Sequence, residues 1–505
     1  MEGLRGPFSG AVRAPCAHLP MRPPLDLQNP PRTIRFDADY RMTIGGAAVT
    51  TGQLLDVINP ATGKVFAQAP QADAQTLEAA VAAGKAALPG WRATPVEARR
   101  ERLKAAADLI EANAEALARL FTREQGRPHE GALGEILQAA FWMRTTADLS
   151  IPVDVTEDTP TRRIEVHHEP LGVVCGIVPW NFPITLAVWK ITPALLTGNT
   201  LVLKPSPFTP LCTLKLGELL APLFPPGVLN VVSGGDELGP LMTSHPGFAK
   251  ISFTGSTATG KKVMESAARD LKRITLELGG NDAAIVLPDV DVEAIAQKIF
   301  FGAFFNTAQI CVATKRLYIH EDIYEALRDR LHGLALAITV GDGAEQGSVL
   351  GPIQNAAQHR RVLGLIEDAR ASGLTLLEGK AVPEGGGYFV PITLVDNPPD
   401  DARVVTEEAF GPVLPLLSFK DIDEVVERAN DTPYGLAGAV WSADVGKAVE
   451  IAHRLETGTV WINHNLDATP LTPLAGAKQS GFGVENGVAG LLEFTQPKAI
   501  YILKA

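Results

Sequence analysis

A cysteine and a glutamate in two short motifs could together carry out covalent chemistry on a carbonyl compound. Cys311 ends the segment 306–311, NTAQIC, and Glu277 lies in the segment 276–280, LELGG. A thiolate can attack a carbonyl carbon, and a carboxylate can activate water to release the resulting acyl group. Alone, the pair is weak evidence, because a lone cysteine among apolar residues is more often a packing residue and a glutamate beside two glycines can be a turn residue.

Three further motifs strengthen the functional interpretation. Residues 179–183 read PWNFP, residues 253–257 read FTGST, and residues 408–412 read EAFGP. Together with the motifs around Glu277 and Cys311, they resemble the NAD(P)-dependent aldehyde dehydrogenase superfamily, in its hydrolytic, non-acylating type. The resemblance runs from about residue 37 to the C-terminus, and five motifs in the family's order leave little room for chance agreement.

Size and composition favour a large globular protein without a polyanionic partner. The chain has 505 residues, of which 46% are hydrophobic and 20% charged, which is enough for two domains with large cores. Its formal net charge of −12 disfavours nucleic acid and anionic membrane surfaces, since both require a clustered positive field. No apolar run approaches the roughly 20 residues that span a bilayer.

The cysteines indicate a reducing compartment. Four in so long a chain, Cys16, Cys175, Cys212 and Cys311, do not make a disulfide framework and show no CxxC spacing for zinc. We therefore expect a cytoplasmic protein without a metal site. Residues 1–36 are rich in Pro and Arg and lack the apolar stretch of a secretory signal, so we expect a disordered tail or a start codon assigned too early.

Short apolar runs alternate with amphipathic segments along most of the chain. The runs that we expect to be strands in the first half are 173–178, 200–203, 228–232 and 250–253, with a helix such as 211–220 between them. This alternation predicts an α/β fold with a parallel sheet covered on both faces, here the Rossmann-type dinucleotide domain. A second alternating region starts near residues 283–287 and should form the α/β catalytic domain that contains Cys311.

The N-terminal helices also have start signals. Asp73 can cap a helical run, and residues 94–97, TPVE, have the spacing of a capping box with proline in the first turn, so we expect two helices here. Two further segments have strand-like patterns: residues 162–167 alternate in polarity, and residues 499–503, near the C-terminus, are apolar. In the family that this chain resembles, such segments form the bridging β-hairpin and final strand through which subunits pair, so we expect a homodimer or homotetramer.

The resemblance divides the chain into four parts. These are a tail at 1–36, a dinucleotide-binding domain at 37–151 and 171–278, a catalytic domain at 279–478, and an oligomerisation element at 152–170 and 479–505.

The expected cofactor site departs from the usual Rossmann fingerprint, because no G-x-G-x-x-G motif follows a strand. The candidate turn is 255–260, GSTATG, which precedes a helix whose N-terminus offers N–H donors and a positive dipole to a pyrophosphate. It is a near-match to a P-loop, but Lys262 stands where Ser or Thr would hold magnesium. A nucleotide triphosphatase is therefore disfavoured.

The resemblance implies a set of cofactor-binding residues: Trp180, Lys204, Ser206, Gly235, Gly239, Gly255, Ser256, Glu408 and Phe410. In it, Lys204 reaches the adenine-side ribose, although alone it would read as a solvated lysine after a strand. Glu408 and Phe410 hold the nicotinamide ribose and ring. Pro207 stands where many NAD-selective relatives have a glutamate that repels a 2′-phosphate. We therefore expect either NAD or NADP as cofactor, with NAD slightly favoured.

The resemblance also implies a mechanism. The Cys311 thiolate attacks the aldehyde, and the Asn181 amide and the Cys311 backbone N–H stabilise the oxyanion. Hydride transfer to the nicotinamide leaves a thioester, which water activated by Glu277 hydrolyses to the carboxylic acid. An apolar pocket should raise the pKa of Glu277. Glu485 matches a second family carboxylate that relays the proton, with a surface loop residue as an equal alternative.

The expected substrate pocket is apolar. Its residues by resemblance are Phe182, Leu186, Trp189, Phe305, Ile310 and Val312. The absence of arginine among them disfavours dicarboxylic semialdehydes and favours an apolar or aromatic aldehyde. Leu474, Ala475 and Ala308 differ from common family residues, Ala308 standing where glycine is frequent.

Two other functions are alternatives to that of an aldehyde dehydrogenase. A non-catalytic structural or binding protein on the same fold is disfavoured by the intact Cys311, Glu277 and Asn181. A cysteine hydrolase or acyltransferase without a dinucleotide would leave the EAFGP motif at 408–412 without a role.

Overall fold

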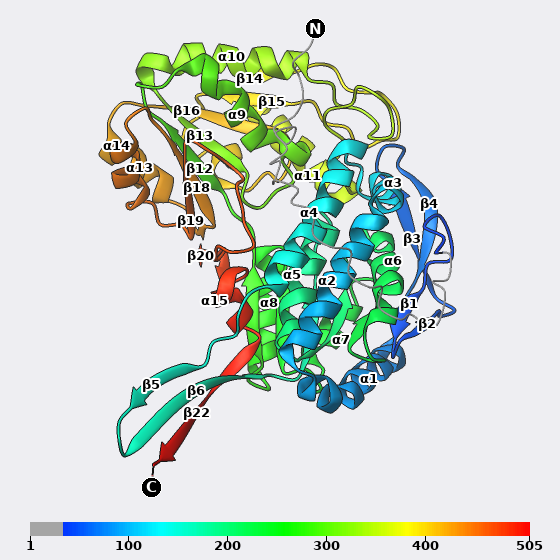
Figure 1. Cartoon of the computed structure of the whole chain (residues 1–505). Helices are drawn as coiled ribbons and strands as arrows, with labels where there is room; N and C mark the ends of the chain where they lie inside the picture. The colour runs from blue at the N-terminus through cyan, green and yellow to red at the C-terminus, as the bar shows by residue number, and fades with distance from the viewer. Residues whose placement is uncertain (1–33, 505) are drawn as a thin grey trace, which may run out of the picture.

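The computed structural model describes residues 34–504, and the predicted N-terminal tail lies outside the described residues up to residue 33. None of the helices in this described part combines the length and apolar character that a membrane crossing requires. Two large sheets, each with helices on both faces, make up most of the molecule, and a long antiparallel hairpin extends from one end (Figure 1). The predicted α/β class is confirmed.

The first sheet has eight strands. In spatial order they are β2 (Ala47–Val49), β1 (Met42–Ile44), β9 (Leu229–Val231), β8 (Thr200–Lys204), β7 (Val173–Ile177), β10 (Lys250–Thr254), β11 (Arg273–Glu277) and β21 (Gly481–Phe482). The five strands from β9 to β11 run parallel, and those at the two edges pair antiparallel. Four of these five strands, β7 to β10, were predicted from the sequence to within one residue at each end, and β11 was not predicted. Burial of the sheet on both faces explains the mostly apolar runs of β7 and β8.

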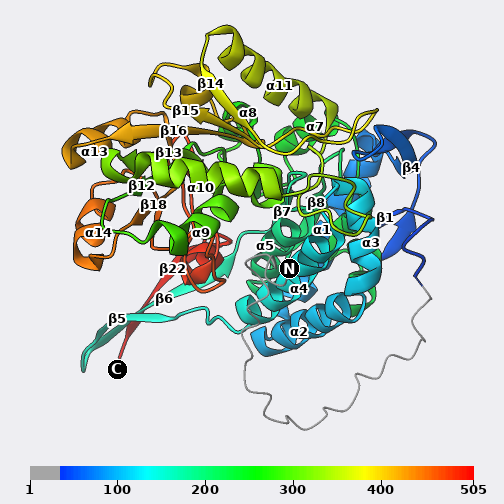
Figure 2. The same cartoon turned by 90° about the horizontal axis from the view of Figure 1, so that it is seen from above.

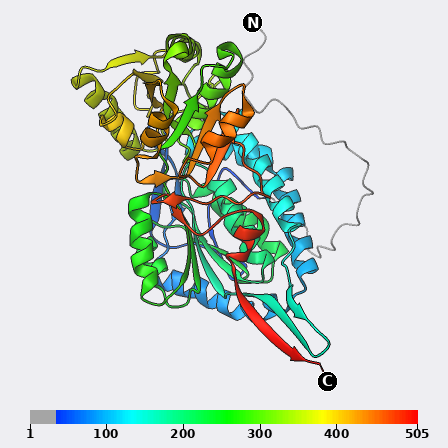
Figure 3. The ribbon, with the colours of Figure 1, turned by 90° about the vertical axis from the view of Figure 1, so that its left-hand side faces the viewer.

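Helices cover both faces of this sheet (Figure 3). They are α1 (Ala74–Ala93), α2 (Val96–Ala112), α3 (Ala114–Gln125), α4 (His129–Ala147), α5 (Pro183–Leu196), α6 (Leu211–Leu220), α7 (Leu238–Ser244) and α8 (Thr257–Ala268). Asp73 caps α1 as predicted, accepting a hydrogen bond from the Thr76 N–H at 2.8 Å.

Two expectations for the N-terminal helices were wrong. The chain forms four helices between residues 74 and 147 rather than two. The capping box at Thr94 does not form, because the Thr94 hydroxyl donates instead to the Gly90 carbonyl at the end of α1. Helix α2 begins after Pro95 without a side-chain cap. The short turn between the helices orients Thr94 toward the preceding helix, a tertiary effect that the spacing of the motif does not encode.

The second sheet has seven strands. Their order is β14 (Thr375–Glu378), β15 (Thr393–Asp396), β16 (Val413–Phe419), β13 (Thr314–His320), β12 (Asp282–Val286), β18 (Ala437–Trp441) and β19 (Thr459–Ile462). All neighbours pair in parallel except β14 with β15. Alternate residues of β12 enter two separate cores, Ala284 with Val286 in one and Ala283 with Ile285 in the other, so this sheet is also buried on both faces.

The helices of this second layer divide between the two cores. On one side lie α9 (Val292–Phe304) and α10 (Tyr324–Ala337), and on the other lie α11 (Ala356–Ala371), α13 (Ile422–Asn430) and α14 (Val445–Ala452). The remaining short elements are β3 (Leu54–Asn59), β4 (Lys64–Pro70), α12 (Arg403–Thr406), β17 (Tyr434–Gly435), β20 (Ala477–Lys478) and α15 (Gly487–Leu492).

A three-stranded antiparallel sheet extends away from both layers (Figures 1 and 2). It consists of β5 (Asp154–Asp158), β6 (Arg162–Pro170) and β22 (Thr495–Leu503), with β6 in the centre. The two strands predicted at 162–167 and 499–503 are present and are longer than predicted. β22 leaves Tyr501 and Leu503 exposed, at 68% and 83% of their full surface.

Candidate active site

The turn that connects the two large sheets brings Glu277 close to the Cys311 segment. Glu277 is the last residue of β11, and β12 starts at Asp282. A side chain at Gly279 would lie 2.4 Å from a carboxylate oxygen of Glu408, and one at Gly280 would lie 2.8 Å from the Cys311 carbonyl oxygen. Because only glycine leaves this space free, the LELGG motif allows both groups to approach the turn.

The segment before Cys311 has an unusual backbone. Asn306, Thr307 and Ala308 form a short helical turn with φ values of 52°, 55° and 60°, in the left-handed region that non-glycine residues seldom adopt. Ala308, predicted as a departure from a frequent glycine, is one of these three residues. The Thr307 hydroxyl donates to the Gly351 carbonyl at 2.9 Å, which helps to hold this conformation. Cys311 follows as a partly exposed residue.

Asn181 lies against the same segment. Its side-chain amide nitrogen donates to the Gln309 carbonyl at 2.9 Å, two residues before Cys311. The amide carries two N–H groups, so one remains for another acceptor. The PWNFP and NTAQIC motifs, far apart in sequence, therefore meet in the fold.

A buried ion pair supports both motifs and was not predicted from the sequence. Arg127 binds Glu135 at 2.7 Å. It also donates to the Asn181 carbonyl at 2.7 Å and to the Asn306 side-chain oxygen at 3.0 Å. The second oxygen of Glu135 accepts two backbone N–H groups at the start of α5. Burial raises the pKa of Glu135, while the charge of Arg127 opposes that shift. The pair had no clear signal in the sequence, since Arg127 stands in a polar segment between α3 and α4.

Glu277 has the surroundings of a general base. It is 5% exposed, and its Oε1 atom has no hydrogen-bond partner among the described residues. Burial raises its pKa well above the usual range, the charge of Glu485 raises it further, and Lys190 opposes the shift. The charge of Glu277 also raises the pKa of the Cys311 thiol, so the two groups interact electrostatically.

Glu485 is buried, which contradicts the surface-loop alternative. Its Oε1 lies 2.6 Å from Lys190 Nζ and also accepts from the Ser252 hydroxyl. Lys190 donates in addition to Ser252 and Thr254 at 3.0 and 2.9 Å. Sequence reasoning missed Lys190, although a single lysine in the otherwise apolar helix α5 was a usable signal, since such a charge needs a buried partner.

Most of the predicted cofactor residues follow adjacent parallel strands. Gly235 and Gly239 come after β9, Lys204 ends β8, Trp180 follows β7, and Gly255 follows β10. The carboxyl ends of these strands lie at one edge of the sheet, where α/β proteins bind ligands. The Ser256 hydroxyl caps α8 by accepting from the Thr259 N–H at 3.3 Å, and the Gly255 N–H donates to the Glu277 carbonyl at 3.0 Å. A backbone hydrogen bond thus joins the turn after β10, predicted to hold the pyrophosphate, to the candidate base.

A carboxylate that sequence reasoning overlooked lies near Lys204, the residue predicted for the adenine side of the cofactor. Lys204 is buried, and burial lowers its pKa to about 8, while the charge of Asp236 opposes that shift. Asp236 follows β9, next to Gly235. Ser206, two residues beyond Lys204, is buried and accepts from the Phe208 N–H at 3.3 Å. The charge near Lys204 therefore depends on Asp236 as well as on the absence of a glutamate at position 207.

Glu408 and Phe410 lie at the other side of the Glu277 turn. The Glu408 carboxylate accepts from the Gly280 N–H at 3.2 Å and lies 3.5 Å from Lys315 Nζ. Phe410 packs edge-to-face on Trp180, with ring centroids 5.4 Å apart. Two predicted cofactor residues thus contact each other across the two sheets.

The predicted substrate residues fall into three pairs. Phe182 and Phe305 both face the Arg127 guanidinium, at 4.2 and 5.9 Å from their ring centroids. Leu186 and Trp189 lie one turn apart on α5, where Trp189 stacks on Trp142 at 5.2 Å. Ile310 and Val312 flank Cys311. The sequence expectation of no arginine here needs correction, but Arg127 is already bound to Glu135 and to backbone and amide oxygens and is 3% exposed.

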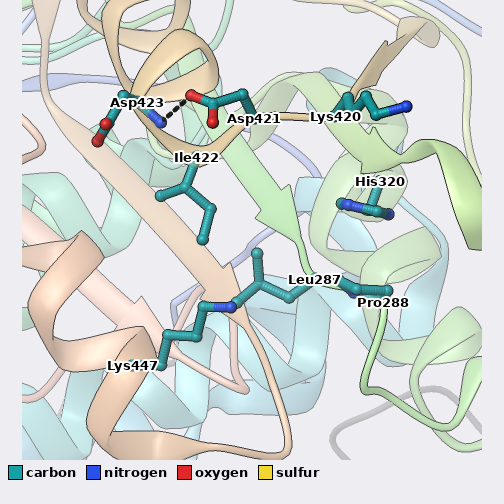
Figure 4. Close-up of a pocket in the computed structure, with 8 residues that line it drawn as sticks. All are labelled: Leu287, Pro288, His320, Lys420, Asp421, Ile422, Asp423 and Lys447. Carbon is teal, nitrogen blue, oxygen red and sulfur yellow. Dashed lines mark hydrogen bonds between the residues drawn. The ribbon is translucent and has the colours of Figure 1, made fainter.

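A separate surface hollow of about 260 Å³ lies at the carboxyl ends of β12, β13 and β16 (Figure 4). Its lining contains both lysines and aspartates: Leu287, Pro288, His320, Lys420, Asp421, Ile422, Asp423 and Lys447. None of them is a predicted site residue. Between residues 34 and 504 no three His, Cys, Asp or Glu side chains are grouped so that they could hold a metal ion.

Comparisons with known proteins agree with this geometry. The model of the aldehyde dehydrogenase family matches residues 48–500. Phenylacetaldehyde dehydrogenase of Pseudomonas fluorescens is 40% identical, with 92% of this chain and 96% of that protein covered. The NAD⁺ complex structure of aldehyde dehydrogenase from Bacillus cereus has a TM-score of 0.90 at 36% identity, covering 93% of this chain and 97% of that one. An NADP-dependent enzyme of E. coli has a TM-score of 0.89 at 36% identity, covering 92% and 98%. The chain therefore belongs to the aldehyde dehydrogenase family and is an NAD(P)-dependent enzyme that oxidises aldehydes.

Proposed function

We propose that the chain oxidises apolar or aromatic aldehydes to carboxylic acids through a covalent intermediate on Cys311, which water activated by Glu277 hydrolyses. The observation that carries the proposal is the environment of Glu277, a buried carboxylate with an unpartnered oxygen and a raised pKa, whose charge reaches the Cys311 thiol. A non-catalytic protein on the same fold is not favoured, because a buried carboxylate with an unpartnered oxygen is costly and is typical of a catalytic site.

In the first half of the reaction, the Cys311 thiolate attacks the aldehyde carbon and the carbonyl oxygen becomes an oxyanion. The second N–H of the Asn181 amide stabilises this oxyanion together with the Cys311 backbone N–H. Arg127 donates to the backbone carbonyl of Asn181, and the Asn181 side-chain amide donates to the Gln309 carbonyl. The side chain of Asn181 is therefore positioned before substrate arrives. When bound, the oxidised nicotinamide accepts the hydride that leaves the substrate carbon.

In the second half, a thioester on Cys311 is hydrolysed. Glu277 takes a proton from water as the water attacks, and its raised pKa makes it a stronger base than an ordinary carboxylate. Deacylation should therefore accelerate as pH rises through the pKa of Glu277. We assign Glu485, bound to Lys190, as the group that relays the proton away from Glu277.

Replacing Asn181 with Ala should reduce turnover roughly 10²–10³-fold, since the removal of one oxyanion donor typically has that effect. Stopped-flow measurement of reduced cofactor formation would report the step directly. Unchanged turnover with an aldehyde whose oxidation is rate-limiting would make Asn181 a structural residue that only holds the Gln309 carbonyl.

We assign the dinucleotide to the carboxyl edge of the eight-stranded sheet. Lys204, Ser206, Gly235 and Gly239 would hold its adenine side, and Gly255 and Ser256 its pyrophosphate. Trp180, Glu408 and Phe410 would hold the nicotinamide side. The free N–H groups at the start of the twelve-residue helix α8 support this placement, because they suit a phosphate.

NADP should be accepted alongside NAD, with kcat/KM values that differ by less than about a hundredfold. Pro207 brings no repelling carboxylate, and a lost repulsion of about 1–3 kcal/mol corresponds to roughly 5–150-fold in discrimination. Pro207→Glu should shift the ratio toward NAD. Asp236→Asn provides the matched change in the opposite direction, since it removes the carboxylate near Lys204. Exclusion of NADP by the wild type beyond a thousandfold, or no effect of Pro207→Glu, would show that position 207 does not face the adenine ribose.

An apolar or aromatic substrate is supported by two findings. The predicted pocket residues are apolar or aromatic, and the similar protein of Pseudomonas fluorescens is a phenylacetaldehyde dehydrogenase. Assaying a panel of aromatic, aliphatic and dicarboxylic semialdehydes with NAD and with NADP tests the proposal. Highest kcat/KM for an aryl or alkyl aldehyde is expected, and a preference for an acidic semialdehyde would contradict it.

We further propose that residues 37–151 and 171–278 form the dinucleotide-binding domain and residues 279–478 the catalytic domain. Residues 152–170 and 479–505 would form the oligomerisation element of a cytoplasmic homodimer or homotetramer. The extended sheet supports this role, because its two edge strands have no further strand beside them in residues 34–504 and β22 exposes Ile500, Tyr501, Ile502 and Leu503. The three described cysteines are free thiols, which suits a reducing compartment.

A further inference from the structure

Lys315, near the start of β13, is a buried lysine that touches the candidate nucleophile's backbone. Its ammonium group donates to the Cys311 carbonyl at 2.5 Å and to the Ala313 carbonyl at 3.5 Å. It lies 3.5 Å from Glu408 Oε1, and its side chain is 5% exposed. Lys315 thus bridges the cysteine segment and the carboxylate that we assign to the nicotinamide side of the cofactor site.

The charges around the thiol are unbalanced without this lysine. Glu277 at the end of β11, Asp282 in β12 and Glu408 before β16 all disfavour a negative charge on Cys311. Burial disfavours it more than any of them, and the pKa of the thiol is raised to about 12. Among the charged groups that act on Cys311 in the described part of the chain, Lys315 is the one that lowers this pKa.

We propose that Lys315 is a positioning residue of the reaction, which promotes ionisation of the Cys311 thiol and holds the cysteine segment against Glu408. The proposal rests on the proposed function in that Cys311 is the nucleophile. Its physical basis is that a cation held at the backbone of the cysteine stabilises a thiolate more strongly in a water-poor site than in water. The hydrogen bond to the Cys311 carbonyl fixes the position of the ammonium relative to the cysteine backbone.

Lys315 also compensates Glu408. A partly buried carboxylate without a cation beside it would be costly, and its charge opposes thiolate formation on Cys311. The two effects have opposite signs and can be separated by mutation: removal of Lys315 should disfavour the thiolate, and removal of the Glu408 charge should favour it.

The test measures alkylation of Cys311 by iodoacetamide against pH in the full chain without cofactor, with the modified peptide quantified by mass spectrometry. This readout depends on the thiolate fraction, and a purely structural role of Lys315 would not shift its pH profile. Lys315→Met should move the profile up by at least about one pH unit, which is about tenfold slower alkylation at pH 8. Lys315→Arg should restore the rate to within about threefold.

Two further variants complete the test. Lys315→Gln keeps a hydrogen-bond donor for the Cys311 carbonyl but lacks the charge, so it should behave as Lys315→Met does. Lys272→Met is the matched control, because Lys272 is also buried but pairs with Asp270 at 2.5 Å, and its profile should equal that of the wild type.

Glu408→Gln tests the same role of Lys315 if the Lys315 variants do not fold. It should speed alkylation of Cys311 several-fold at pH 8, because Lys315 then acts on the thiol without a competing carboxylate. An unchanged pH profile in folded Lys315→Met and Lys315→Gln, or slower alkylation in Glu408→Gln, would overturn the role of Lys315. Failure of Cys311 as nucleophile would appear separately, as aldehyde turnover that survives Cys311→Ala.

Discussion

Replacing Cys311 with Ala should abolish aldehyde oxidation while dinucleotide affinity stays within about threefold of the wild type. The thiol performs the covalent step, whereas the cofactor contacts that we assign lie on other residues, so the two properties should separate. Turnover of an aromatic aldehyde and fluorescence titration with NAD and NADP measure them independently.

Cys212→Ala is the control for that experiment. Cys212 is fully buried on α6, and burial raises the pKa of its thiol, so it is a packing residue that should not contribute to chemistry. Activity per folded molecule should therefore remain near the wild-type value. Dehydrogenase activity of Cys311→Ala within about tenfold of wild type would contradict the nucleophile assignment.

Replacing Glu277 with Gln should preserve the first hydride transfer but slow hydrolysis of the acyl-enzyme by about a hundredfold or more, which is the range of a lost general base. Rapid mixing with aldehyde and cofactor should then show a burst of about one equivalent of reduced cofactor per site, followed by slow turnover. The substitution keeps the side-chain shape and removes the ability to accept the proton.

Glu124→Gln offers a matched buried carboxyl group outside the site. Glu124 accepts the Leu211 and Cys212 backbone N–H groups, and burial raises its pKa to about 7, as burial also raises that of Glu277. It should show no burst beyond that of the wild type. Normal steady-state turnover of Glu277→Gln would show that another group deprotonates the water.

The sequence was sufficient to predict elements and turns whose signal is local. The buried strands β7 and β8 are mostly apolar runs, and the turn after β10 is marked by glycines and by a serine that caps α8. The LELGG and NTAQIC motifs lie together in the fold, because the glycines that let Glu408 and Cys311 approach are part of the LELGG motif itself.

The buried charges could not be predicted in the same way. Lys190 and Glu485 are 295 positions apart, and Arg127 is 54 positions from the Asn181 carbonyl that it binds. Which charges meet depends on how α5 and α4 pack against the sheet, and that is a property of the tertiary fold. Of these charges, only Lys190 stands in a clearly apolar segment, which indicates a partner without identifying it, whereas Arg127 and Glu485 stand among polar residues or glycines.

The partners of Thr94 and Asp236, two residues nearer the surface, also could not be predicted from the sequence. The capping-box spacing at Thr94 was correct, but the hydroxyl binds the preceding helix instead. Asp236 is distant from Lys204 in sequence and near it in space, because both follow adjacent parallel strands. The spacing of a motif describes residues that are close in sequence. Hydrogen-bond partners and charge interactions depend on residues that the fold brings close in space.

The most direct test of the mechanism is to locate the acyl group that accumulates in Glu277→Gln. The variant is mixed with an aromatic aldehyde and NAD, quenched in acid and digested, and the peptides are mapped by mass spectrometry. We expect about one acyl group per chain, as a thioester on Cys311, that appears together with the burst of reduced cofactor. An acyl group on Cys175 or Cys212, or a burst of reduced cofactor without any acyl adduct on Cys311, would contradict the account.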